Sequence, residues 1–95
     1  MNSANTILLV KTIVDQQRQI MGPMAIEEAN KVQGLKISMN LDTINVTGQS
    51  VEVLNNLVMQ YKSLFGQVSV EVCRDSVKAI LHKISSADEL PGMLR

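Results

Sequence analysis

The strongest constraint on the fold of this chain is a ten-residue pattern that occurs twice, 44 residues apart. The segments Ile20–Ala29 and Leu64–Cys73 both read apolar, apolar, Gly, any residue, apolar, small, β-branched, Glu, any residue, small. The small residues of each copy begin at Gly22 and Gly66 and recur after three and four positions, so they share one face of a helix. Such a face lets two helix backbones approach closely. The repeat therefore predicts helix-on-helix packing, within one chain as the preferred arrangement or between two chains of a dimer.

Composition limits the kind of protein that this chain can be. Its 95 residues are expected to form a single domain, residues 1–95, with one core. The only aromatic residues are Tyr61 and Phe65, so Val, Ile, Leu and Met must fill the core. Nine basic and nine acidic residues cancel, which removes the positive field that non-specific nucleic-acid binding needs. A lone cysteine, Cys73, excludes an internal disulfide, and no signal peptide or membrane span is apparent, so we expect a cytoplasmic protein.

Two amphipathic helices are predicted in the first third of the chain. Apolar residues recur at three and four positions over Ile7–Ile20, which predicts a helix that stops near Met21. Pro23 disfavours helical geometry at Gly22 but is suited to the first turn of a new helix. We therefore expect a second helix from Pro23 to about Val32.

Over residues 34–48 the period of the apolar residues changes from helical to alternating. Alternation predicts two short strands, joined by a turn centred on residues 42–43. The register that follows places all the apolar side chains on one side of a hairpin through the pairs Leu41–Ile44 and Met39–Val46. A four-residue loop in the same register is an equal alternative, because threonine resists the positive φ of a tight turn. A lone hairpin is marginally stable, so it must lie on the helices or pair with another chain.

The second half of the chain predicts a long helix. From Ser50, a candidate N-cap, apolar residues follow a helical period as far as Ser85. Gly66 leaves two possibilities, since glycine inside a helix costs only about 1 kcal/mol relative to alanine. We expect one long helix that can bend or kink at Gly66, with a break there as the alternative, because Gln67 can extend a helix where proline cannot. Residues 86–95 are expected to form a flexible tail.

The sequence Gly-Pro-Met-Ala at residues 22–25 follows an apolar pair and a polar helix. In this setting it resembles the Ile-Gly-Pro-x-Ala element of helical tail modules attached to bacterial and cyanobacterial signalling proteins, such as Ser/Thr kinases and response regulators. The resemblance covers about residues 16–29 and implies a signalling or assembly role without enzymatic activity. The chain departs from the element by having Met21 in the apolar pair, and the resemblance does not account for the alternating segment Leu35–Val46.

Residue types that carry catalysis or bind metals are present without forming a recognisable site. His82 is the only histidine, and with Cys73 it falls short of a four-ligand zinc set. Cys73 lies on the small apolar face, where burial raises the pKa of a thiol and makes it unreactive. Glu27 and Glu71 occupy matched repeat positions, but exposed helix glutamates are far commoner than a catalytic pair. We therefore expect no enzymatic activity, no cofactor and no metal.

The predicted fold class is α+β and mainly helical, with two N-terminal helices, a small β-hairpin and one long C-terminal helix. The predicted function is a non-enzymatic protein–protein interaction module: a small adaptor, regulator or assembly subunit in signalling that binds a partner protein or forms a homodimer. Its candidate contacts are two apolar corners and the hairpin edge, namely Met21, Gly22, Pro23, Met24, Leu64, Phe65, Gly66, Ile44 and Val46. The alternative is a nucleic-acid-binding transcriptional regulator that uses the basic residues Arg74, Lys78 and Lys83, although Asp75 and the zero net charge argue against it.

Overall fold

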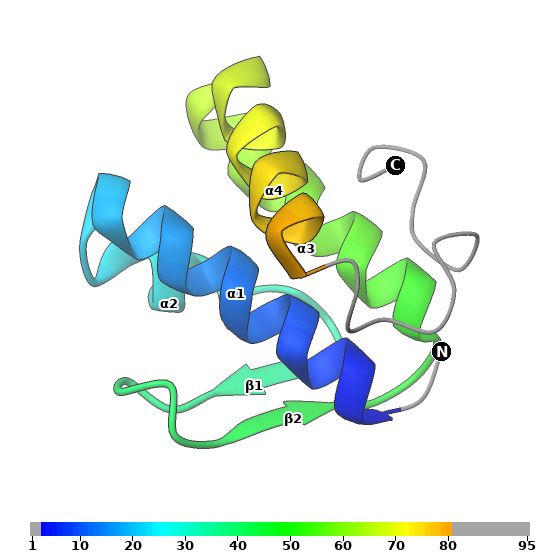
Figure 1. Cartoon of the computed structure of the whole chain (residues 1–95). Coiled ribbons are helices and arrows are strands. Elements are labelled where there is room, and N and C mark those ends of the chain that lie inside the picture. The colour runs from blue at the N-terminus through cyan, green and yellow to red at the C-terminus, as the bar shows by residue number, and fades with distance from the viewer. Residues whose placement is uncertain (1–2, 81–95) are drawn as a thin grey trace.

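The computed structural model describes residues 3–80, which form four helices and one hairpin (Figure 1). The elements follow in the order α1 (Ser3–Met21), α2 (Met24–Ala29), β1 (Leu35–Ile37), β2 (Ile44–Val46), α3 (Ser50–Phe65) and α4 (Gln67–Ile80). The predicted α+β, mainly helical fold class is confirmed. The predicted helix end at Ser85 and the predicted tail over residues 86–95 lie outside the described residues.

The expected long C-terminal helix is divided in two, because Gly66 separates α3 from α4, and the alternative of a break at Gly66 is the one observed. Gly66 has φ 73° and ψ −155°, a combination that is essentially restricted to glycine. Its N–H donates to the carbonyl oxygen of Lys62 at 2.7 Å and so closes the last turn of α3. At the other corner, Gly22 has φ 67°, and its N–H donates to the carbonyl oxygen of Arg18 at 2.8 Å. A glycine with positive φ therefore closes the preceding helix at both corners, and a proline is not required.

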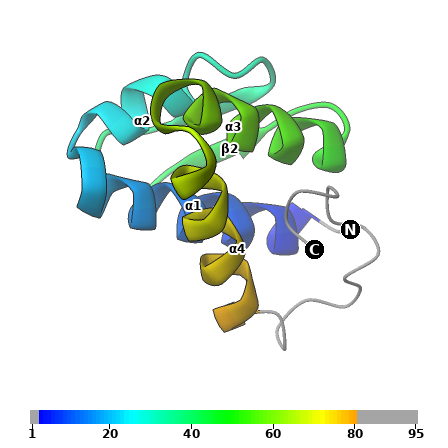
Figure 2. The ribbon, with the colours of Figure 1, turned by 90° about the horizontal axis from the view of Figure 1, so that it is seen from above.

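The sequence repeat corresponds to two copies of a helix–glycine–helix unit, α1–α2 and α3–α4. Gln17 Nε2 donates to the carbonyl oxygen of Ser69 at 3.1 Å, and the Tyr61 hydroxyl donates to the carbonyl oxygen of Ala25 at 2.6 Å. At the 44-residue shift Gln17 aligns with Tyr61 and Ala25 with Ser69, so each bond is the counterpart of the other. This reciprocity indicates an approximate two-fold axis between the halves. Accordingly, α4 packs across α1 (Figure 2), and α2 packs on α3.

A third bond lies where such an axis would place it. The hydroxyl of Thr6 donates to the Ser50 hydroxyl at 2.9 Å, and these two residues are also counterparts at the 44-residue shift. Ser50 therefore links the start of α3 to α1. It is not the N-cap that its sequence position suggested; Gln49 holds that place and makes no capping bond with its side chain.

Small residues at matched positions permit this close packing. Ala25, Ala29, Ser69 and Cys73 are all buried, so both small faces are covered within the chain. They do not pack on each other: α2 packs on α1 and α3, and α4 also packs on α1 and α3. Gly22 and Gly66 form the corners and are not part of these packed faces. The core otherwise consists of aliphatic side chains, with Tyr61 as its aromatic member. The largest fully buried side chains are Tyr61, Leu9, Ile13, Ile26, Leu35, Leu54, Leu57, Gln17, Val10, Val14 and Val58.

The two counterpart bonds predict unequal costs of mutation. Tyr61→Phe leaves the buried carbonyl of Ala25 without its hydroxyl donor and is expected to lower the free energy of unfolding by about 1–2 kcal/mol. Gln17→Met is expected to change it by less than about 1 kcal/mol, because Gln17 Oε1 is buried without a hydrogen-bond partner among the described residues. Urea denaturation of both variants checks this. A loss for Gln17→Met that equals the loss for Tyr61→Phe would contradict it.

The hairpin is present, but its predicted register is wrong. β1 and β2 pair antiparallel with Leu35 opposite Val46 and Ile37 opposite Ile44. Residues 38–43 form the loop, which is longer than predicted because its own polar side chains close it. These bonds run from Ser38 Oγ to Asn40 Oδ1, from Asn40 Nδ2 to Asp42 Oδ2 and from the Thr43 N–H to Ser38 Oγ. The register differs by an even number of residues, so the predicted core face of the strands is retained.

Leu41 and Met39, which were predicted to pair with β2, lie in this loop instead. Leu41 has φ 64°, which is rare for a non-glycine residue, and its side chain is buried in the core. Met39 is exposed.

The second helix also ends earlier than predicted, at Ala29, because the side chain of Asn30 bonds to the backbone of β1.

Candidate functional site

The two predicted apolar corners lie on the same side of the molecule, away from the N-terminus, with the α1–α2 corner at the left and the α3–α4 corner at the top of Figure 1 (see also Figure 2). The bonds from Gln17 to Ser69 and from Tyr61 to Ala25 connect the end of each long helix to the helix that follows the other corner. The hairpin lies on another side of the fold (Figure 1). The predicted contact residues therefore form two separate groups, and the hairpin edge is not part of the corner surface.

The predicted corner residues differ in exposure. Met24, Leu64 and Phe65 are exposed large apolar side chains, with 44%, 42% and 45% of their surface accessible. Pro23 and Gly66 are exposed, whereas Gly22 is partly buried and Met21 packs against the core. In the hairpin, Ile44 is buried and Val46 half-buried, so their side chains belong to the core side of the sheet.

Two further residues, which were not predicted as contacts, complete this surface. Ile20 is 52% exposed and Val68 is 64% exposed. At the 44-residue shift Ile20 is the counterpart of Leu64, and Met24 is the counterpart of Val68. The repeat could therefore have predicted Ile20 and Val68 as contacts, since the same positions around each glycine carry large apolar residues. We define the corner surface as Ile20, Met24, Leu64, Phe65 and Val68.

The corner surface can contribute to binding only through the burial of its apolar area by a partner, because none of its five side chains carries a charge or a strong hydrogen-bonding group. Its charged neighbours are of both signs: Arg18 and Lys62 lie in the last turns of α1 and α3, and Glu27 is exposed in the first turn of α2. The side chain of Arg18 is 3.5 Å from Asp15. An apolar centre with a rim of mixed charge is the usual composition of a protein–protein contact.

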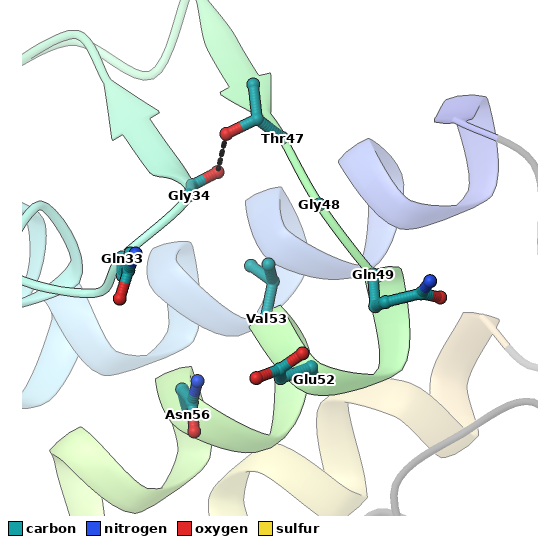
Figure 3. Close-up of a pocket in the computed structure, with 8 residues that line it drawn as sticks. All are labelled: Gln33, Gly34, Thr47, Gly48, Gln49, Glu52, Val53 and Asn56. Atoms are coloured by element: carbon teal, nitrogen blue, oxygen red, sulfur yellow. Dashed lines mark hydrogen bonds between the residues drawn. The ribbon is translucent and has the colours of Figure 1, made fainter.

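A hollow of about 290 Å³ lies where the hairpin joins α3 (Figure 3). It is lined by Gln33, Gly34, Thr47, Gly48, Gln49, Glu52, Val53 and Asn56. The amides of Gln33, Gln49 and Asn56 can form hydrogen bonds, whereas Thr47 is already bonded to the carbonyl of Gly34. Glu52 is the one titratable side chain among these eight residues. The lining therefore suits a polar contact and does not assemble a nucleophile with a base.

The residues considered for catalysis are dispersed or buried. Burial raises the pKa of the Cys73 thiol to about 11, although the hydrogen bond from Gln17 Nε2 opposes this rise. Glu27 and Glu71 are exposed. His82 lies outside the described residues. Within residues 3–80, no group of three His, Cys, Asp or Glu side chains is arranged to hold a metal ion.

One buried carboxylate has a structural role between α2 and α3. Glu28 Oε2 accepts a hydrogen bond from Lys31 Nζ at 2.8 Å, and Glu28 Oε1 accepts one from Gln60 Nε2 at 2.7 Å. These bonds, that of Lys31 first, lower the pKa of the Glu28 carboxyl below its usual value. The counterpart of Glu28 in the other half is Val72, so this polar link breaks the internal symmetry.

The basic residues of the alternative hypothesis are only partly available. Lys78 is exposed on α4, and Arg74 is half-buried. Lys83 lies outside the described residues.

None of the described helices combines the length and apolarity needed to cross a bilayer. Comparisons of the chain with family models, with curated proteins and with solved structures found no match. The interpretation of the corner surface therefore depends on its own geometry and chemistry.

Proposed function

We propose that this chain is a non-enzymatic protein–protein interaction module that binds a partner protein through the corner surface. The observation that supports this most directly is the position of its only phenylalanine. Phe65 is almost half exposed beside Leu64 at a helix corner, although the core contains a single aromatic residue, Tyr61. Large apolar side chains gathered at one place on a surface are typical of binding sites.

The size of the surface fits modest affinity. Burying a large apolar side chain completely contributes about 1.5–3 kcal/mol, so each half-exposed side chain has roughly 1 kcal/mol to contribute. Five such side chains must also offset the entropy lost on association. Binding through the corner surface alone would therefore be weak and readily reversed, as suits an adaptor or regulator.

The resemblance to helical tail modules supports a role of this type in signalling. The residues that carry it, Gly-Pro-Met-Ala at 22–25, form the first corner, and Met24 belongs to the corner surface. An adaptor, regulator or assembly subunit needs a stable scaffold with an apolar contact site and requires no catalytic group.

The test compares partner retention by matched variants. The double variant Leu64→Ser/Phe65→Ser removes apolar area from the corner surface, whereas Val51→Ser/Met59→Ser removes similar exposed apolar side chains elsewhere on α3. Quantitative affinity enrichment with the immobilised chain is expected to find a protein that the wild type and the Val51/Met59 variant retain equally, and that the Leu64/Phe65 variant retains at least ten-fold less. Circular dichroism confirms that both variants fold.

Two outcomes would contradict the proposal. If both double variants retain every bound protein to the same extent, the corner surface is not the binding site. If the chain instead binds duplex DNA with an affinity that falls steeply with salt, the nucleic-acid alternative is favoured.

A further inference from the structure

The two edges of the β1–β2 hairpin differ in whether their backbone groups are bonded. On the outer edge of β1, the side chain of Asn30 forms the two hydrogen bonds that a neighbouring strand would form with Ile37. Asn30 Nδ2 donates to the carbonyl oxygen of Ile37 at 2.9 Å, and the Ile37 N–H donates to Asn30 Oδ1 at 2.7 Å. The Leu35 N–H is bonded to the carbonyl of Val32 at 3.2 Å. This edge is therefore largely satisfied within the chain, and the exposed Lys36 adds a charge beside it.

Among residues 3–80, no side chain covers the outer edge of β2 with hydrogen bonds in this way, although α1 packs beside this strand. Inward bonds join the Thr47 N–H to the carbonyl of Gly34 at 2.7 Å, and the Ser38 N–H to the carbonyl of Thr43 at 2.9 Å. Successive residues of a strand direct their backbone groups to opposite edges, so Thr43, Asn45 and Thr47 bond inward while Ile44 and Val46 direct their N–H and C=O outward. Within residues 3–80, no hydrogen bond is formed by these outward groups of Ile44 and Val46. Of the elements that the structure describes, none forms a strand beyond β2 (Figure 1).

The sequence of this edge does nothing to prevent pairing. Residues 43–47 read Thr-Ile-Asn-Val-Thr, with four β-branched residues, no charge and no proline. Edge strands that must stay unpaired usually carry a lysine, a proline or a bulge. β1 has both a lysine and the cover by Asn30, so within one hairpin the two edges differ in protection.

We propose that the outer edge of β2 pairs antiparallel with the same edge of a second copy of this chain. A two-fold axis through Asn45 places Ile44 opposite the partner's Val46 and Val46 opposite the partner's Ile44. Each of these pairs exchanges two N–H···O=C bonds, so four hydrogen bonds satisfy all the outward groups of both strands. The two hairpins then form one four-stranded sheet.

The side chains of β2 complement themselves in this register. Thr43 lies opposite the partner's Thr47, a favourable cross-strand pair, and Asn45 lies opposite the partner's Asn45 on the exposed face. Ile44 and Val46 stay on the core side, so the apolar faces of the two sheets become continuous. No like charges face each other in this pairing, because residues 43–47 carry no charge in either copy. A strand from an unrelated protein would not necessarily match this edge in the same way. This self-complementarity identifies the second copy as the occupant.

Charge substitutions at Asn45 test the proposal, because this side chain is exposed in the monomer and its replacement leaves the core intact. Sedimentation of the full chain over a dilution series is expected to show a wild-type dimer. Asn45→Lys and Asn45→Glu each place like charges opposite each other across the two-fold axis. Lys36 lies opposite Asn45 within the hairpin, so it adds to the repulsion in the lysine variant and partly offsets it in the glutamate variant. Asn45→Lys is therefore expected to weaken dimerisation at least ten-fold, and Asn45→Glu is expected to weaken it less. An equimolar mixture of the two variants is expected to restore dimers, because the charges are then opposite.

Two further variants distinguish pairing through the β2 edge from association through another surface of the chain. Val46→Pro removes one outward N–H without removing an inward bond and is expected to weaken the dimer, whereas Val46→Ala keeps that N–H and is expected to retain it. Leu64→Ser/Phe65→Ser is expected to dimerise as the wild type does, since the corner surface is elsewhere. A wild type that remains monomeric at millimolar concentration would overturn the proposal. So would a dimer that persists unchanged in both Asn45 variants.

Discussion

Gly34→Ala is expected to lower the free energy of unfolding by about 2–5 kcal/mol, which is a large share of the stability of a domain of this size. Gly34 has φ 87°, and a side chain in left-handed backbone costs roughly 1–2 kcal/mol. A methyl group here would also collide with the backbone carbonyl oxygen of Thr47 and would lie 3.3 Å from Val53 Cγ2. Such overpacking costs about 1–3 kcal/mol, because the backbone of β2 must move.

Gly48→Ala is the matched control for this prediction. Gly48 has φ 92°, but a methyl group there would meet no atom within 4 Å. Its replacement is expected to cost only the backbone term of roughly 1–2 kcal/mol. Urea denaturation of both variants measures the difference. Equal losses would show that the close approach of Gly34 to Thr47 does not contribute to stability.

Stability is expected to fall as the pH rises from about 9 to 11, by roughly 3 kcal/mol from Cys73 alone. Burial raises the pKa of the Cys73 thiol from 9.0 to about 11 in the folded chain. The unfolded chain therefore loses this proton at a lower pH than the folded chain does. The contribution is fully present below pH 9 and is lost as the pH rises to about 11. Burial also raises the pKa of Tyr61 above its ordinary value of 10.0, which extends the loss to higher pH.

Cys73→Ala separates the thiol from other groups that titrate in this range. Alanine already occupies the counterpart position, Ala29, so the packed face is expected to accept it. Thermal denaturation at intervals between pH 8 and 11 is expected to show a shallower decline for the variant than for the wild type. Parallel curves would mean that the buried thiol is not responsible for the alkaline loss of stability.

The candidate site could be predicted in part. The apolar corners were predicted from the residues beside Gly22 and Gly66, and among these the large side chains of Met24, Leu64 and Phe65 are exposed. Whether a corner residue faces the solvent depends on the crossing of helices from the two halves. For this reason Met21 packs against the core, while Ile20 beside it is exposed.

The hairpin shows a different limit. Alternation placed Ile44 and Val46 on the core side correctly, since an error of an even number of residues leaves the face unchanged. The register itself depends on the side-chain hydrogen bonds that close the loop. A loop closed in this way and a short turn differ little in free energy, so the sequence of the strands does not decide between them. Asn30 likewise covers the edge of β1 from outside the hairpin, so the difference between the two edges could not be predicted from the strands.

By itself, the sequence determined the helical and alternating segments, the core face of each and the equivalence of the two halves, because these depend on period and on residue size at fixed spacing. The tertiary structure decided the break at Gly66, the reciprocal bonds of Gln17 and Tyr61 and the unbonded edge of β2. Glycine is tolerated inside a helix and adopts the backbone geometry of a break equally well, so the packing of α4 across α1 decides between the two. Hydrogen bonds between residues 36 or more positions apart exist only after the two halves have packed, and no local pattern specifies them.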